Sequence, residues 1–179
     1  MAEICTKLML IRHAEKPDDD AGVLGVTEAG QQDKDDLSVR GWQRSGALVR
    51  LFGPTPPVKL RVGMATPGAI FAAQSTDASP SKRPKHTVKA LAEALGLEVL
   101  TPCPPHQEAQ LVAMALAAAE TVLICWHHER IGALAQQVGC DPGAWPADVF
   151  DRVLVLDRAG AGWILTRINQ DLLPGDAGA

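Results

Sequence analysis

The chain has 179 residues, of which 46% are hydrophobic and 21% charged, and its formal net charge is −4. This composition is typical of one globular domain, here predicted over residues 1–179, and the acidic balance argues against nucleic acid as the main partner. No apolar run reaches about 18 residues, so no membrane span is expected. The cysteines lack CxxC spacing and the chain begins without a signal-peptide pattern, which predicts a cytoplasmic protein with no thiolate metal site.

The first half of the chain alternates short apolar runs with polar or amphipathic stretches. An apolar run over residues 6–12 predicts a buried strand, and the Asp- and Gly-rich residues 16–37 predict an exposed loop. A helix is expected over residues 38–52, because it begins with a serine suited to an N-cap and is followed by a Gly-Pro pair. Extended chain is expected over residues 59–63 and a second strand over residues 69–73.

The second half continues this alternation. Apolar residues at helical spacing predict a helix over residues 83–95, which a glycine ends. A short strand is expected over residues 98–100 and an alanine-rich helix over residues 107–119. The strongly apolar residues 121–126 predict another strand, and helical spacing resumes over residues 131–138.

The last predicted elements form a hairpin. Residues 153–156 and 163–166 are strand-like, and the Gly-rich stretch 159–162 between them suits a turn. Strands that alternate with helices pack most readily as layers around a parallel sheet. The sequence therefore predicts an α/β fold, a three-layer α/β/α sandwich with a mostly parallel sheet.

Histidines follow two of the apolar strands at the point where each strand ends. Arg12 and His13 follow the first strand, and His127 and His128 follow the strand over residues 121–126. The carboxyl ends of parallel strands meet at one edge of a sheet, where ligands bind. Arginine grips phosphate oxygens and histidine can attack phosphorus, so the two clusters predict phosphoryl chemistry.

These motifs resemble those of the histidine phosphatase superfamily, the phosphoglycerate-mutase-like proteins, over nearly the whole chain. Arg12-His13-Ala14-Glu15-Lys16 is similar to the family's Arg-His-(Gly/Ala)-Glu signature. The other matching segments are residues 37–44, 81–87 and 122–133, and residues 170–176 resemble the tails of a bacterial subgroup. Within residues 81–87 the chain departs from the family pattern, because His86 replaces the usual glutamine.

The resemblance implies a role for several residues. His13 would attack phosphorus and form a phosphohistidine intermediate. Arg12 and Arg83 would hold the non-bridging oxygens and stabilise the charge that develops on them. Glu15 and Lys16 follow the first motif and are expected to bind substrate or to orient the site. Neither the motifs nor the resemblance implies a metal or another cofactor.

The second histidine of the family's site has two candidates here. An ungapped match to the family's Val-Gly-His segment selects His127, whereas a Trp-x-His-Glu arrangement selects His128. Because side chains alternate along a strand, only one of them is expected to point into the pocket. His128 is the preferred candidate.

The general acid, which would protonate the leaving oxygen, also stays open. The family often has a glutamate between its second arginine and its second histidine, and Glu98, Glu108 and Glu120 lie in that interval. Glu108 is preferred, because it opens a helix after a Pro-rich loop.

The sequence therefore predicts a phosphatase acting on a phosphorylated small molecule or a phosphoprotein. A catalytically weak module that binds phosphate or a phosphoprotein is the main alternative, since no clear acid motif is present. A metal hydrolase that uses His13, His127 and His128 is a third, but Arg12 and Arg83 would repel a cation there.

Overall fold

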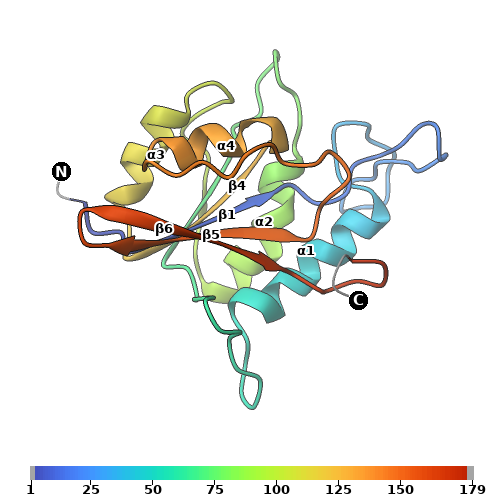
Figure 1. The fold of residues 1–179 in the computed structure, drawn as a ribbon. Coiled ribbons are helices and arrows are strands. Elements are labelled where there is room, and N and C mark those ends of the chain that lie inside the picture. Colours follow the sequence, from blue (N-terminus) through green and yellow to red (C-terminus); the bar gives the residue numbers. More distant parts are fainter. Residues whose placement is uncertain (1–2, 177–179) are drawn as a thin grey trace.

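The computed structural model describes residues 3–176. Their strands form one six-stranded sheet in the order β3-β2-β4-β1-β5-β6 (Figure 1). Strands β3, β2, β4 and β1 are parallel, whereas β5 pairs antiparallel with β1, and β6 antiparallel with β5. The strand bounds are β1 Lys7–Arg12, β2 Ala69–Ala72, β3 Val99–Leu100, β4 Thr121–Trp126, β5 Arg152–Ala159 and β6 Gly162–Asn169.

Two helices cover each face of the sheet (Figure 1). Leu8 and Leu10 of β1 pack in a core with α3 (Glu108–Leu116) and α4 (His128–Gln136). Met9 and Ile11 point to the other face, where they pack in a second core with α1 (Val39–Phe52) and α2 (Arg83–Leu95). The expected α/β/α sandwich with a mostly parallel sheet is therefore confirmed.

Local sequence signals account for the ends of the two helices that flank the site. Ser38 is the N-cap of α1, and its Oγ accepts a hydrogen bond from the Gly41 amide at 3.1 Å. Gly96 ends α2 in the left-handed conformation, at φ 66°, which glycine adopts without strain. These signals set where α1 begins and where α2 ends.

Four segments differ from the sequence expectations. Residues 59–63 form no strand, and the Arg61 side chain instead donates to the Asn169 carbonyl. Helix α3 ends at Leu116 rather than near residue 119, because the Leu116 carbonyl accepts hydrogen bonds from the amides of Ile4 and Cys5. Strands β5 and β6 extend beyond their apolar cores, since their backbone pairing continues to the turn.

Three expectations concern the chain as a whole: membrane spans, the state of the cysteines and the number of domains. No helix within residues 3–176 combines the length and the apolar character needed to cross a membrane. The four cysteines are buried free thiols. One domain over residues 1–179 stays a prediction, because residues 1–2 and 177–179 lie outside the described part.

Candidate active site

The ends of β1 and β4 bring the two polar clusters together. Arg12 lies opposite Trp126 in the parallel register, and the His13 amide donates to the Trp126 carbonyl at 3.1 Å. The centroids of the His13 and His127 rings are 5.8 Å apart, and the rings meet edge to face at 74°. Residues more than 100 positions apart in the sequence thus lie next to each other at the carboxyl edge of the sheet.

The His13 ring is poised to act as a nucleophile. Its Nδ1 lies 2.8 Å from the Ala14 carbonyl oxygen, which can only accept, so Nδ1 carries the proton and Nε2 has a free lone pair. Burial lowers the pKa of His13 well below its ordinary value, and the nearby charges of Arg12 and Arg83 act in the same direction. The imidazole is therefore unprotonated at Nε2 at neutral pH.

Arg12 is a buried cation that is only partly satisfied by the protein. Its Nη1 donates to the carbonyls of Ala147 and Val149 at 2.7 and 3.2 Å, and its guanidinium lies 3.7 Å from the Phe150 ring centroid. Its Nε and Nη2 are buried without a hydrogen-bond partner among residues 3–176. Burial lowers the pKa of Arg12 to about 10, so it stays charged at neutral pH. Such unsatisfied donors fit an anionic ligand.

Arg83 repeats this pattern from the first turn of α2. Its Nη1 donates to the Lys34 carbonyl at 3.1 Å, and its Nε is buried without a partner in the described chain. Burial lowers its pKa, and the carboxylates of Asp35 and Asp36 partly oppose that effect. A cation at the start of a helix is unfavourable against the helix dipole, and a bound anion would offset this cost.

The two candidate histidines occupy different places. His127 is the N-cap residue of α4 and lies against His13, whereas His128 is the first residue of the helix. The Nδ1 of His128 is buried and has no hydrogen bond within residues 3–176, although Glu129 Oε2 lies 3.2 Å away. Burial lowers the pKa of both imidazoles. The ring contact places His127 against His13, whereas no ring contact joins the preferred candidate, His128, to His13 in the described part of the chain.

The sequence reasoning missed Glu129. Its carboxylate lies on the first turn of α4 and raises the pKa of Arg12, Arg83 and both histidines of the cluster. Its side chain is 65% exposed, so solvent reaches it. The available signal was its place directly after His127 and His128 at the end of a strand.

The prediction that Glu108 donates the proton is not supported by its surroundings. Its carboxylate accepts hydrogen bonds from Arg130 Nε and Nη2 at 3.0 and 2.8 Å, from Trp126 Nε1 at 3.1 Å and from the His106 amide. These bonds outweigh burial and lower the pKa of Glu108 to about 2. It is therefore ionised at neutral pH and has no proton to give. Its contacts instead join α3 to the start of α4.

Substitution of Glu108 by glutamine is expected to lower the free energy of unfolding at pH 7 by about 3 kcal/mol, because Arg130 loses a buried ionic partner. Because the pKa of Glu108 is lower in the folded than in the unfolded protein, its ionised carboxylate stabilises the fold at pH values above the unfolded-state pKa. This stabilisation is lost as the pH falls toward the folded-state pKa of about 2. Urea unfolding at pH 7 and pH 3 should show the difference between the variants shrinking at pH 3. The exposed Glu120→Gln is the control, and a pH-independent difference would contradict this account of Glu108.

Glu15 and Lys16 are placed apart from the two guanidinium groups. The Glu15 carboxylate is bound by Arg44 Nη2 at 2.7 Å and by Arg40 Nε at 3.0 Å, on the side of α1. Lys16 is exposed and lines a neighbouring cavity with Phe150. Glu15 is thus positioned to orient the site rather than to contact an anion, whereas Lys16 stays a candidate for substrate contact.

Within residues 3–176, no group of three or more His, Cys, Asp or Glu side chains is arranged to hold a metal ion. Arg12 and Arg83 place two positive charges beside His13, which disfavours a cation there. This charge pattern is suited to an anion.

Comparisons with known proteins show the fold of this chain. The protein histidine phosphatase SixA, solved in complex with tungstate, matches with a TM-score of 0.56 and 15% identity over 92% of this chain and 97% of its own. A proposed phosphohistidine phosphatase, SixA from Agrobacterium tumefaciens, matches with a TM-score of 0.48 and 14% identity over 93% and 99% of the two chains. No family model matches the sequence, and no curated protein is significantly similar to it.

The chain therefore shares the fold of the tungstate-bound SixA structure. The resemblance seen in the short motifs is confirmed at the level of the fold, since the match to the tungstate-bound SixA extends over almost the full length of both chains. At 15% identity this likeness shows the fold alone, so an activity has to be argued from the residues of the site.

Proposed function

We propose that this chain is a metal-independent phosphatase that hydrolyses a phosphorylated small molecule or a phosphoprotein through a phosphohistidine on His13. The observation that carries the proposal is the buried His13 ring near Arg12 and Arg83, whose guanidinium groups keep three buried nitrogens without a hydrogen-bond partner within residues 3–176: Arg12 Nε and Nη2, and Arg83 Nε. The shared fold of SixA, named a protein histidine phosphatase and solved with an oxyanion, supports the same reading.

The first chemical step forms the phosphoenzyme. The Nε2 lone pair of His13 attacks phosphorus, so that a P–N bond forms while the P–O bond to the leaving group breaks. The leaving oxygen keeps the electron pair of the broken bond and takes a proton from Glu129, which has to carry that proton before this step. Arg12 and Arg83 bind the non-bridging oxygens, and His127 completes the pocket beside them.

The second step returns the site to its starting state. A water oxygen attacks phosphorus, the P–N bond breaks, and its electron pair returns to Nε2 of His13. The attacking water gives a proton to the Glu129 carboxylate, and phosphate leaves. The Nδ1–H bond to the Ala14 carbonyl keeps the ring in the same tautomer throughout.

Hydrolysis of p-nitrophenyl phosphate in the presence of a chelator tests the proposed activity. Turnover is expected to be insensitive to the chelator, because every proposed role belongs to a protein side chain. Activity that disappears with the chelator and returns with zinc would contradict the proposal. The control is the same assay with the matched phosphate-free phenol, which reports any effect of the chelator on detection.

Glu129→Gln should separate proton donation from binding. With phenyl phosphate, whose leaving phenol has a pKa near 10, kcat is expected to fall about 100-fold. With p-nitrophenyl phosphate the loss should be small, because that phenolate leaves without a proton. The exposed Glu98→Gln serves as the control. Equal losses on the two substrates would show that Glu129 acts on binding and not on proton transfer.

A phosphate-binding module with little turnover is the second candidate. The observation that favours it is the Glu108 carboxylate, which is held ionised by Arg130 and Trp126 and is therefore unsuited to protonate a leaving group. Saturable binding of inorganic phosphate by a protein that hydrolyses no aryl phosphate would select this candidate.

A further inference from the structure

A buried network of charges connects α1 with the C-terminal tail, defined as residues 170–176. Arg44 of α1 is 2% exposed, and its Nη2 donates to Glu15 Oε1 at 2.7 Å and to Asp176 Oδ1 at 2.6 Å. Its Nη1 donates to Asp176 Oδ2 and to Gln170 Oε1, both at 3.0 Å. Arg40 also binds both carboxylates from the exposed side. Burying these charges costs free energy, so loss of one partner would leave the opposite charge buried and unpaired.

The network reaches the segment that orients the nucleophile. The carbonyl that fixes the His13 ring belongs to Ala14, and Ala14 is joined to Glu15 by the next peptide bond. The Ala14 amide donates to Thr87 Oγ1 at 2.8 Å, and the Glu15 carbonyl accepts from the amide and the hydroxyl of Ser38. Both sides of this peptide are thus held by hydrogen bonds. The Glu15 side chain is a further anchor of this segment, because Arg44 holds its carboxylate by hydrogen bonds.

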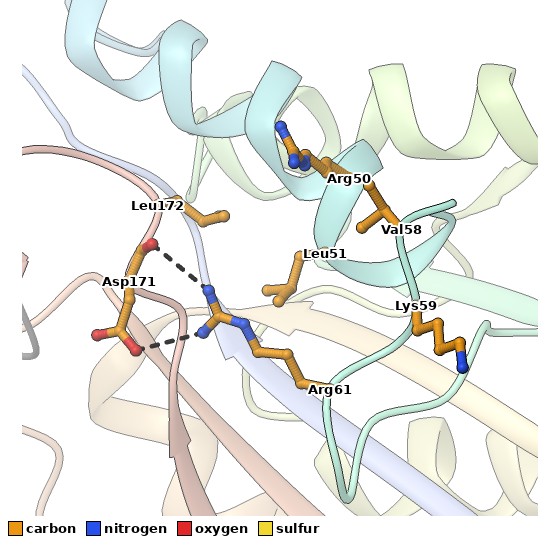
Figure 2. A pocket seen from close by; sticks show the side chains of 7 residues that line it. All are labelled: Arg50, Leu51, Val58, Lys59, Arg61, Asp171 and Leu172. Carbon is orange, nitrogen blue, oxygen red and sulfur yellow. Dashed lines mark hydrogen bonds and ion pairs between the residues drawn. The ribbon is translucent and has the colours of Figure 1, made fainter. Parts of the chain in front are cut away.

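The tail carries one exposed and one buried carboxylate that differ in their contacts. Arg61 binds the exposed Asp171 carboxylate at 3.2 Å and borders a surface cavity with Leu51 and Leu172 (Figure 2). In the buried carboxylate, Asp176 Oδ2 accepts from the amides of Leu172 and Leu173 at 2.9 and 3.0 Å. The Asp176 carboxylate therefore couples the shape of the tail to Arg44.

We propose that Asp176 is a positioning residue: through Arg44 and Glu15 it holds the Ala14 carbonyl where it keeps the His13 ring in its Nδ1–H form. This inference rests on the proposed role of His13 as nucleophile. Asp176 is 6% exposed and belongs to the tail, so it contacts no reacting atom and acts only through its neighbours.

Asp176→Asn tests the proposal with little change of shape. Both carboxylate oxygens accept from N–H donors, so an amide in either orientation turns its own N–H groups against a donor. The hydrogen bonds between residue 176 and the Arg44 guanidinium should therefore be weakened or lost. Asp171→Asn is the matched control, because it makes the same chemical change in the same tail at the exposed ion pair.

Two readouts are required. Long-range proton–nitrogen NMR of the folded protein reports the His13 tautomer and needs no activity. The Nε2–H form should appear in Asp176→Asn and not in Asp171→Asn. On p-nitrophenyl phosphate, kcat should fall about 10- to 100-fold in Asp176→Asn while KM changes little, since a misaligned nucleophile slows chemistry more than binding.

A wild-type tautomer and a wild-type kcat in folded Asp176→Asn would overturn the proposal, and so would equal effects in both tail variants. If Asp176→Asn does not fold, Arg44→Lys gives the same decision, because lysine keeps the charge and loses the fork that bridges the two carboxylates. If the wild-type protein hydrolyses no phosphate ester, the tautomer alone decides, so failure of the proposed function stays distinguishable.

Discussion

Replacement of His13 by asparagine is expected to lower kcat about 10⁴-fold or more on every phosphate ester, because the substitution removes the side chain that attacks phosphorus in the first step of the proposed mechanism. The asparagine amide can still donate to the Ala14 carbonyl in place of Nδ1, so the fold around the site should be kept. Steady-state hydrolysis of p-nitrophenyl phosphate measures the loss, and binding of tungstate to the variant checks that the anion pocket survives.

A control for this variant must alter a histidine outside the site. His106 is exposed and has a positive φ of 75°, a conformation that asparagine tolerates, so His106→Asn is expected to retain wild-type kcat. Residual activity in His13→Asn within tenfold of the wild type would exclude His13 as the nucleophile. The candidate site would then have to work through another group.

Arg12→Lys is expected to lower kcat/KM about 100- to 1000-fold and to weaken inhibition by inorganic phosphate. Arg12 uses Nη1 to hold the loop carbonyls of Ala147 and Val149, and offers Nε and Nη2 to a ligand. A lysine ammonium is one point charge and cannot bind the loop carbonyls and an anion at the same time. Phosphate inhibition constants and kcat/KM for the two proteins measure the effect.

Arg158→Lys is the matched control for this substitution. Arg158 also lies over an aromatic ring, 5.0 Å from the centroid of Trp163, but at the amino end of β1 and away from the candidate site. Its replacement should leave kcat/KM and phosphate inhibition unchanged. Similar losses in both variants would mean that Arg12 supports the fold rather than the anion.

The sequence was most informative where a signal is local. The end of β1 at Arg12, the N-cap at Ser38 and the left-handed glycine that closes α2 were all predictable, because each depends on a few neighbouring residues. Strand alternation also predicted that only one of the two adjacent histidines would point into the pocket. Both histidines lie beyond β4, which ends at Trp126, so their positions depend on where α4 begins and not on strand alternation.

Features that depend on distant partners could not be predicted. Glu108 has the sequence context of an active-site carboxylate, and its real partner, Arg130, lies 22 residues away on another helix. The role of Glu15 depends on Arg44 and Asp176, and the latter is 132 residues from Arg44. No periodicity or motif encodes such contacts, since they follow from packing α1, α4 and the tail around the sheet.

Trapping the phosphoenzyme tests the central claim most directly. The protein is mixed with a labelled aryl phosphate, quenched within one turnover, and the labelled peptide is identified by mass spectrometry. A phosphoryl group on His13, stable in base and labile in acid, is the predicted result. Turnover with no phosphoenzyme, or with the label on a different residue, would contradict the assignment of His13 as the nucleophile.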